Sequence, residues 1–285
     1  MLKFYMPFYY LIYSRLKSKI DFISWIIIFI IPPFILTYTY VDINFGSFIL
    51  LFLLSQIIFN TLYEIGYIEN DIATTKSEEK PTLRLDEKSY AYIQKNYNKI
   101  ITFRYLTVFI SIALLYVINS YFELKLNILP FLLLLVLNRV FFYWHNHVRS
   151  RWNLLTFSML AITKYIFPFI LFVESDKLLF LILLSIVLFP LLRVIEHSTH
   201  KRYDFTQYAQ FIGNHDKFRV AYYSFFILLG VALYFFSIYS KEDFVVAMAL
   251  LLYFFFYRVA SYLLLHKGLY KRDEIKNKDL YVKDI

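Results

Sequence analysis

The chain has 285 residues, of which 60% are hydrophobic and 22% are aromatic, and its formal net charge at pH 7 is +9. Soluble domains contain about 45 to 50% apolar residues, so this composition excludes an ordinary soluble domain and predicts a membrane protein. The absence of cysteine excludes a disulfide framework, a thiolate metal site and a cysteine nucleophile. No soluble segment carries a basic stripe with stacking aromatic residues, so we do not expect nucleic acid as a partner.

Residues 1–22 combine a short Phe and Tyr stretch with basic residues and lack a small-residue cleavage site. This pattern indicates an interfacial helix leading into the first span, not a signal peptide. The following apolar stretches are each long enough to cross roughly 30 Å of hydrocarbon as a helix: 23–41, 46–68, 100–119, 127–144, 153–173, 177–196, 219–239 and 243–266. Because they are continuously apolar, they predict membrane helices and not a barrel of alternating strands.

Two long connections, 69–99 and 197–218, follow the second and sixth predicted spans and are rich in ionisable residues. Within the first, residues 85–100 have the pattern of an amphipathic helix. The charged tail, 267–285, is expected to be solvated. Without a Gly/Ser linker or a strong repeat, residues 1–285 are predicted to form a single transmembrane domain.

The basic residues that flank the spans predict the orientation of the chain. Both termini and both long connections fall on the side rich in Lys and Arg, whereas the other side has only Lys125, Lys177 and Lys241. By the positive-inside rule the basic side is cytoplasmic. We therefore expect an integral protein of the bacterial inner membrane, with both termini in the cytoplasm and with membrane lipid as a partner.

Several basic residues fall inside the predicted spans: Arg104, Arg139, Lys164, Arg193 and Arg258. At the bilayer centre each would cost about 2.5 to 3.5 kcal/mol on insertion scales, although Arg104 and Arg193 lie near enough to span ends to snorkel. All five fall at the midplane or on its cytoplasmic side, which predicts a polar cavity open to the cytoplasm. One alternative is internal pairing with Glu64 and Glu196, but two carboxylates do not neutralise five cations, so the surplus indicates an anionic ligand.

The second span carries a row of oxygen-bearing side chains into the loop that follows it. Continued as one helix, it places on a single face Asn60, Glu64, Tyr67 and Asp71. Such a row can hold Mg²⁺ that grips a diphosphate, because Mg²⁺ needs only one or two carboxylates beside water and phosphate oxygens. Glu78 would share the face, and Lys80 and Arg84 would bind phosphates directly. The alternative is a solvated charged loop; the polar row already begins inside the span, which argues against it.

The stretch "NDIATTKSEEKPTLRL", residues 70–85, resembles the first motif of the UbiA superfamily of intramembrane transferases, N-D-x-x-D-x-x-x-D followed by a basic, Pro-containing stretch. Asn70 and Asp71 match its opening pair, and Glu78 stands at its last acidic position. Thr74 replaces the middle aspartate, which leaves the number of metal ions open. In that family the two motif loops follow helices two and six, as here, although it usually has nine spans against the eight predicted.

The second loop lacks the second aspartate-rich motif of most prenyl-transferring members; its nearby acids are Glu196 and Asp204. "KRY", Lys201, Arg202 and Tyr203, with "KFRVAYY" at 217–223, is similar to the branch that transfers a 5-phosphoribosyl group to decaprenyl phosphate. A phosphorylated sugar donor carries one more phosphate than a prenyl diphosphate donor does, and Lys and Arg side chains can bind it. The adjacent His197 and His200 lack a complete zinc ligand set, so we do not expect a zinc site.

The resemblance implies an all-α bundle of eight or nine transmembrane helices around a cytoplasm-facing polar cavity, as in UbiA. It implies a Mg²⁺-dependent transfer from a diphosphate-activated donor, either phosphoribosyl pyrophosphate or a prenyl diphosphate, with a polyprenyl lipid as the other substrate. It implies that Asn70, Asp71 and Glu78 bind the metal and that these three residues and Glu64 take part in catalysis. The remaining predicted substrate contacts are Asn60, Tyr67, Lys80, Arg84, Arg139, Lys164, Arg193, Glu196, Lys201, Arg202, Tyr203, Asp204 and Arg258. The alternatives are prenyl transfer to a small acceptor and a non-catalytic transporter or scaffold.

Overall fold

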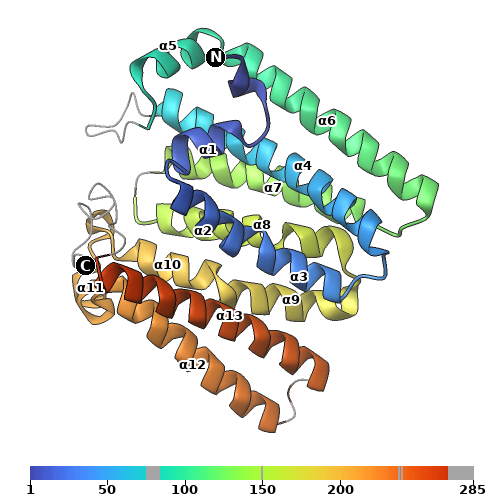
Figure 1. Ribbon diagram of the computed structural model, residues 1–285. Coiled ribbons are helices and arrows are strands. Elements are labelled where there is room, and N and C mark those ends of the chain that lie inside the picture. Colours follow the sequence, from blue (N-terminus) through green and yellow to red (C-terminus); the bar gives the residue numbers. More distant parts are fainter. Residues whose placement is uncertain (75–83, 149, 237, 239, 269–285) are drawn as a thin grey trace. The chain divides into compact units, whose positions relative to one another are not determined.

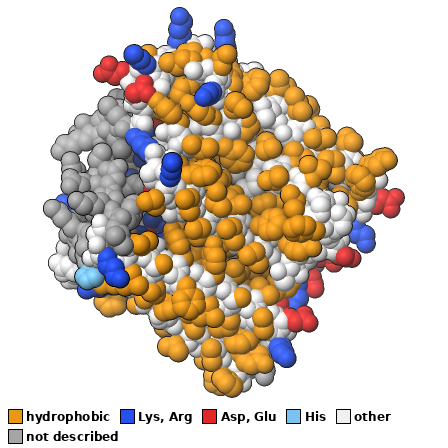
Figure 2. Space-filling view, in the orientation of Figure 1, with side chains coloured by type: hydrophobic (Ala, Val, Ile, Leu, Met, Phe, Trp, Pro, Cys, Tyr) orange, Lys and Arg blue, Asp and Glu red, His pale blue; other side chains and the backbone are white. Residues whose placement is uncertain are grey.

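A computed structural model describes residues 1–74, 84–148, 150–236, 238 and 240–268. Throughout this part of the chain the regular structure is helical, and eight helical segments are long and apolar enough to cross a membrane. These are Lys19–Thr39, Phe45–Ile72, Tyr97–Phe122, Ile128–His147, Asn153–Phe172, Asp176–Ser198, His215–Phe235 and Lys241–His266. In Figure 2 hydrophobic side chains cover most of the visible face. The prediction of an all-α integral membrane protein is confirmed at this level.

Two of the eight segments are broken by proline near their middle. The first consists of α2 (Lys19–Phe29) and α3 (Ile31–Thr39), and Pro32 and Pro33 lie in the first turn of α3. The sixth consists of α9 (Ser175–Leu188) and α10, which starts at Pro190 and ends at Ser198. Proline lacks a backbone N–H and is tolerated in a first helical turn, where no intrahelical acceptor is needed. The breaks therefore follow from the sequence.

The helices group into two compact units, Met1–Ile182 and Leu183–Ile285. The single domain over 1–285 stays a prediction. In the first unit, α4 (Phe45–Ile72) packs against α6 (Tyr97–Phe122) and α7 (Ile128–His147), and α8 (Asn153–Phe172) packs against α7 and α3. In the second unit, α12 (His215–Phe235) and α13 (Lys241–His266) form a helical hairpin, and α10 packs against α12 (Figure 1).

Helix α4 is the most buried of the eight segments. Its Phe59 ring stacks on Phe167 of α8 at 4.2 Å, and Tyr63 meets the edge of Phe142 of α7 at 4.4 Å. Gly66 lies so close to Phe142 that an added Cβ would come within 2.3 Å of the ring. The row predicted along this helix is therefore carried by a tightly packed scaffold.

The N-terminal segment differs from the single interfacial helix predicted for 1–22. It forms a short 3-10 helix, η1 (Leu2–Tyr5), then α1 (Tyr9–Arg15), before α2 starts. The break at Phe8, which has a φ of 63°, leaves backbone N–H groups without intrahelical acceptors. Glu64 of α4 accepts two of them, from Phe8 at 3.1 Å and Leu11 at 2.6 Å. This interaction between distant segments could not be read from local periodicity.

The two long loops are shorter than predicted. Helix α4 continues to Ile72, and the amphipathic helix expected at 85–100 is α5 (Glu87–Lys95), after which α6 begins at Tyr97. The Asp86 side chain caps α5 by accepting the Ser89 N–H at 2.7 Å. The second loop contains η3 (Lys201–Tyr203) and α11 (Thr206–Ile212). Most of the predicted tail, from residue 269 onward, lies outside the described residues.

Candidate functional site

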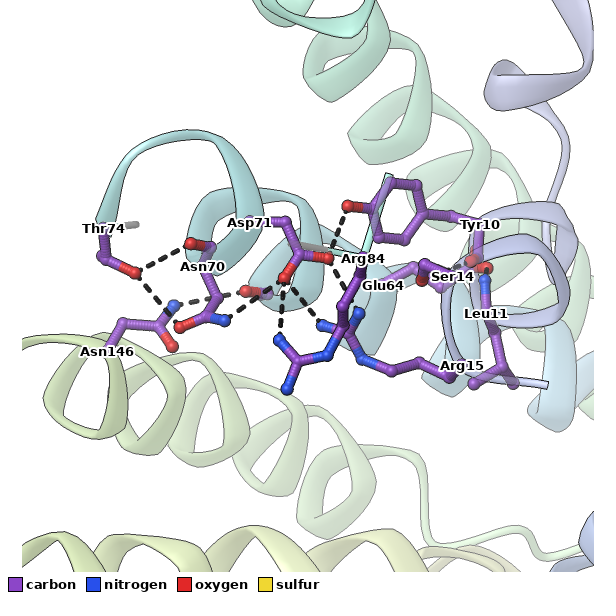
Figure 3. Close-up of polar contacts among 11 residues, drawn as sticks. Tyr10, Leu11, Ser14, Arg15, Glu64, Asn70, Asp71, Thr74, Arg84 and Asn146 are labelled. Atoms are coloured by element: carbon purple, nitrogen blue, oxygen red, sulfur yellow. Dashed lines mark hydrogen bonds and ion pairs between the residues drawn. The ribbon is translucent and has the colours of Figure 1, made fainter. Parts of the chain in front are cut away.

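Asp71, in the last turn of α4, receives donors from two other segments of the chain, α1 and the residues before α5 (Figure 3). Arg15 of α1 binds it with both terminal nitrogens, at 2.8 Å to Oδ2 and 3.0 Å to Oδ1. Arg84 donates to Oδ1 at 3.2 Å, and the Tyr10 hydroxyl donates to Oδ2 at 2.7 Å. We call this group of four side chains the Asp71 corner.

The Asp71 corner carries more positive than negative charge. Its one carboxylate faces two guanidinium groups, and the Asp71 side chain is only 3% exposed, whereas those of Arg15 and Arg84 are 17% and 33% exposed. Burial, followed by the nearby Arg15 charge, lowers the pKa of Arg84 from its usual value. Burial has the same effect on Arg15, but the Asp71 contact outweighs it and leaves the pKa of Arg15 raised. An incoming anion would therefore meet two partly accessible cations held in place by one carboxylate.

Neighbouring groups fix the orientation of this corner. The Tyr67 ring lies 4.4 Å from the Arg15 guanidinium carbon in a cation–π contact. The Asn70 amide donates to Asp71 Oδ1 at 3.3 Å, and the Thr74 hydroxyl donates to the Asn70 carbonyl at 2.8 Å and to Asn70 Oδ1 at 3.1 Å. Of the predicted row on α4, Tyr67 and Asp71 thus both contact Arg15, and Asn70 of the predicted motif donates to Asp71.

The described geometry does not fit Mg²⁺ at Asp71. Both carboxylate oxygens are bound by guanidinium groups, which would repel a dication, and Asn70 Oδ1 is engaged by Thr74. In the part of the chain that is described, no group of three or more His, Asp or Glu side chains is placed to hold a metal ion. Glu78, the third predicted ligand, and Lys80 lie outside the described residues.

Glu64, seven residues before Asp71 on α4, has a different environment. Its side chain is 1% exposed and that of Arg104 is 0% exposed, and Arg104 Nη1 donates to Glu64 Oε2 at 2.5 Å. Arg104 also donates to the backbone carbonyls of Phe4 and Met6, at 2.9 and 3.3 Å. Together with the Phe8 and Leu11 amides, this arrangement fastens the N-terminal segment to α4 and α6. The predicted catalytic role of Glu64 does not fit a carboxylate saturated and enclosed in this way.

The other predicted substrate contacts in the first unit bind partners outside the Asp71 corner. Arg139 Nη2 donates to Glu69 Oε1 at 2.6 Å, and the Asn60 amide is bound within α4, to the Gln56 carbonyl at 2.9 Å. Lys164 lies between the rings of Phe29 and Tyr63, at 4.3 and 4.9 Å. The alternative considered for the basic residues inside the spans, internal pairing with carboxylates, thus holds for Arg104 and Arg139. The sequence analysis did not identify Glu69 as a partner for any of these cations.

In the second unit, the buried Glu196 carboxylate joins α10 to α12. Arg193 donates to its Oε2 at 2.9 Å, and Arg219 Nε donates to its Oε1. Arg219 also donates to Asp216 Oδ1 at 2.8 Å. Arg193 is therefore a third internally paired cation. Arg219 belongs to the quoted stretch "KFRVAYY", but the sequence analysis did not name it as a site residue or as a partner of Glu196.

The "KRY" residues form the single turn of η3. Arg202 donates to the Tyr203 hydroxyl at 2.6 Å and contacts His197 Nε2 at 2.6 Å. Tyr203 is buried, and this burial raises the pKa of its hydroxyl in spite of the neighbouring Arg202. Lys201 is exposed, and Asp204 has a left-handed φ of 56° at the end of the turn. The motif thus offers two exposed cations beside one buried phenol.

Comparison with protein-family models, curated proteins and solved structures found no match to this chain. The case for function therefore depends on the site itself. Its least predictable members are Tyr10 and Arg15, because their partner Asp71 is 61 and 56 residues away in the sequence. Arg15 had been counted only as a basic residue flanking the first span.

Proposed function

We propose that this protein is an integral membrane transferase that transfers a group between a diphosphate-activated donor and a polyprenyl lipid, in the manner of the UbiA superfamily. The observation that carries the proposal is the Asp71 corner, where Arg15 and Arg84 share a single carboxylate. A donor diphosphate supplies the negative charge that this corner lacks, and two guanidinium groups suit its oxygens by geometry and charge.

In the proposed reaction the donor diphosphate leaves from the carbon that is attacked. Arg15 and Arg84 neutralise the charge that develops on the leaving group, while the Tyr10 hydroxyl keeps its hydrogen bond to Asp71. Asp71 positions the two guanidinium groups before the donor arrives. Mg²⁺ is an expectation from the resemblance alone, since no described contact supports it.

The donor proposed is phosphoribosyl pyrophosphate and the acceptor a polyprenyl phosphate, for synthesis of a cell-envelope polysaccharide on the cytoplasmic face of the bacterial inner membrane. The choice of donor rests on the resemblance of "KRY", Lys201 to Tyr203, to the phosphoribosyl-transferring branch. An anionic acceptor also needs no strong general base. Prenyl transfer from a polyprenyl diphosphate is the second candidate, because the Asp71 corner by itself addresses only a diphosphate.

The test is a transfer assay with purified protein, labelled phosphoribosyl pyrophosphate, polyprenyl phosphate and Mg²⁺. Wild type should form a labelled lipid, and Arg84→Met should reduce its rate at least about tenfold, a loss of 1.4 kcal/mol. Lys88→Met is the matched control, since it removes an equal charge from an exposed position of α5 and should leave the rate unchanged.

Other results of this assay distinguish the proposed phosphoribosyl transfer from the alternative functions. Product only from a polyprenyl diphosphate and a small acceptor would favour the prenyl transferase. No product from either donor, with no measurable binding of diphosphate, would favour a transporter or scaffold. Equal losses in Arg84→Met and Lys88→Met would contradict a specific role for the Asp71 corner.

A further inference from the structure

Arg258, on α13 in the second unit, is a buried cation without a carboxylate partner. The residue is 8% exposed and its Nε atom is fully buried without a hydrogen-bond partner. Among the described residues it forms no ion pair; its guanidinium lies beside the Tyr223 hydroxyl and 5.0 Å from the Tyr257 ring. The Tyr223 hydroxyl donates its own proton to the Leu188 carbonyl at 2.5 Å.

Glu196, a carboxylate within electrostatic reach of Arg258, is already bound by other guanidinium groups. Arg193 and Arg219 occupy the two oxygens of Glu196, and Arg219 also holds Asp216. Within the described part of the chain, this group has three guanidinium groups, those of Arg193, Arg219 and Arg258, and two carboxylates, which leaves one positive charge. An uncompensated cation inside a membrane protein is costly and commonly marks a ligand or ion pathway.

The depth of Arg258 limits what can reach it. It lies eight residues before His266, the last residue of α13, which corresponds to about 12 Å along the helix at 1.5 Å per residue. Arg219 is only four residues from the start of α12, about 6 Å by the same measure. An anion that reaches Arg258 must therefore enter the depth of the membrane-spanning helices, as an amphiphile with an anionic head can do.

We propose that Arg258 binds a phosphate group, presented by a polyprenyl phosphate whose apolar chain lies among the membrane-spanning helices. Glu196 and Asp216 hold Arg219 and Arg193, so that Arg258 is left as the group that takes the phosphate. That this phosphate belongs to the acceptor of the transfer rests on the proposed function, whereas the binding itself does not. A free phosphate has the same head chemistry and is the other source to be tested.

The test measures binding without turnover, by native mass spectrometry of full-length protein titrated with a polyprenyl phosphate or with inorganic phosphate. We expect Arg258→Met to weaken polyprenyl phosphate binding at least about tenfold, and Arg258→Lys to retain part of the affinity. Lys241→Met, which removes an equal charge from the exposed start of α13, should bind as wild type does. Thermal unfolding of each variant identifies any that fail to fold. If Arg258→Met does not fold, Arg258→Lys still provides a test of the site.

The outcomes separate this inference from the proposed transfer. Binding of polyprenyl phosphate that depends on Arg258, in a protein without transfer activity, supports the site and counts against the proposed function. Binding of inorganic phosphate with equal affinity and equal dependence on Arg258 would overturn the lipid as the source. Equal affinity of wild type and folded Arg258 variants for polyprenyl phosphate, or no binding by wild type, would overturn the site.

Discussion

Glu64 and Asp71 lie seven residues apart on the same helix and both are buried, yet their surroundings differ. Glu64 meets one enclosed guanidinium and two backbone amides, so its charge is balanced and its acceptors are filled by the chain itself. Asp71 meets two guanidinium groups that are partly exposed. The first environment fastens the N-terminal segment; the second leaves positive charge within reach of a ligand. Burial alone therefore does not identify a functional carboxylate.

The largest expected effect comes from breaking the enclosed pair. Glu64→Gln should lower the free energy of unfolding by about 3 to 5 kcal/mol, because it leaves Arg104 buried and unpaired. Thermal or denaturant unfolding in detergent measures the loss. Asp71→Asn is the matched change in the other environment, and it should cost clearly less because Arg15 and Arg84 can turn to water. Equal losses would contradict the distinction between the two carboxylates.

Gly66, between the two carboxylates, tests the scaffold without changing charge. Gly66→Ala should destabilise the protein by about 1 to 3 kcal/mol, because its Cβ would lie 2.3 Å from the rigid Phe142 ring. Gly46→Ala on the same helix is the control, since the nearest atom to its Cβ is at 3.7 Å. Unfolding measurements on both variants should show a loss only for Gly66.

Arg15 tests whether the Asp71 corner binds the donor. Arg15→Met should weaken diphosphate-donor binding about tenfold, or 1.4 kcal/mol, since half of the guanidinium charge is removed. Isothermal titration with the donor gives the affinity. Lys17→Met removes the same charge from an exposed position two residues away, and a similar loss in that variant would show that only general electrostatic attraction is involved.

Asp86 gives a smaller, pH-dependent effect at the edge of this region. The Tyr13 hydroxyl donates to Asp86, and this hydrogen bond is the main cause of an Asp86 pKa below its usual 3.8. Because the folded pKa is lowered, the stabilising contact is complete above the unfolded pKa and is lost as the pH falls through the folded value. The protection of the α5 amides, measured as the exchange rate relative to the intrinsic rate at the same pH, should fall below about pH 4. Asp86→Asn, which keeps a helix cap, should remove the pH dependence.

The smallest expected change follows metal removal. Donor binding measured by titration should be nearly the same with a chelator as with Mg²⁺, because Arg15 and Arg84 supply the positive charge in the described geometry. Arg15→Met is the control that lowers affinity in both conditions. A loss of binding on chelation would show that the donor releases Asp71 from its arginines and that a metal takes their place.

The sequence predicted the helices well and the pairing of charges less well. The eight spans and the row from Asn60 to Asp71 follow from apolar runs and the helical repeat, and both were recovered with end shifts of a few residues. The pairing of Arg104 with Glu64 had been weighed only as an alternative. Glu69 as the partner of Arg139, and Arg219 as a partner of Glu196, were not anticipated.

The amino-acid sequence by itself determined that this chain crosses a membrane as helices, because transfer into hydrocarbon sums over neighbouring residues and backbone polar groups must be satisfied locally. It also determined that Glu64, Tyr67 and Asp71 share one helix face. The tertiary structure alone decided which carboxylate is filled and which is shared by two cations, since that depends on the N-terminal segment packing against α4. Electrostatic pairing is set by distance in space, and the chain brings Tyr10 and Arg15 to Asp71 from more than fifty residues away.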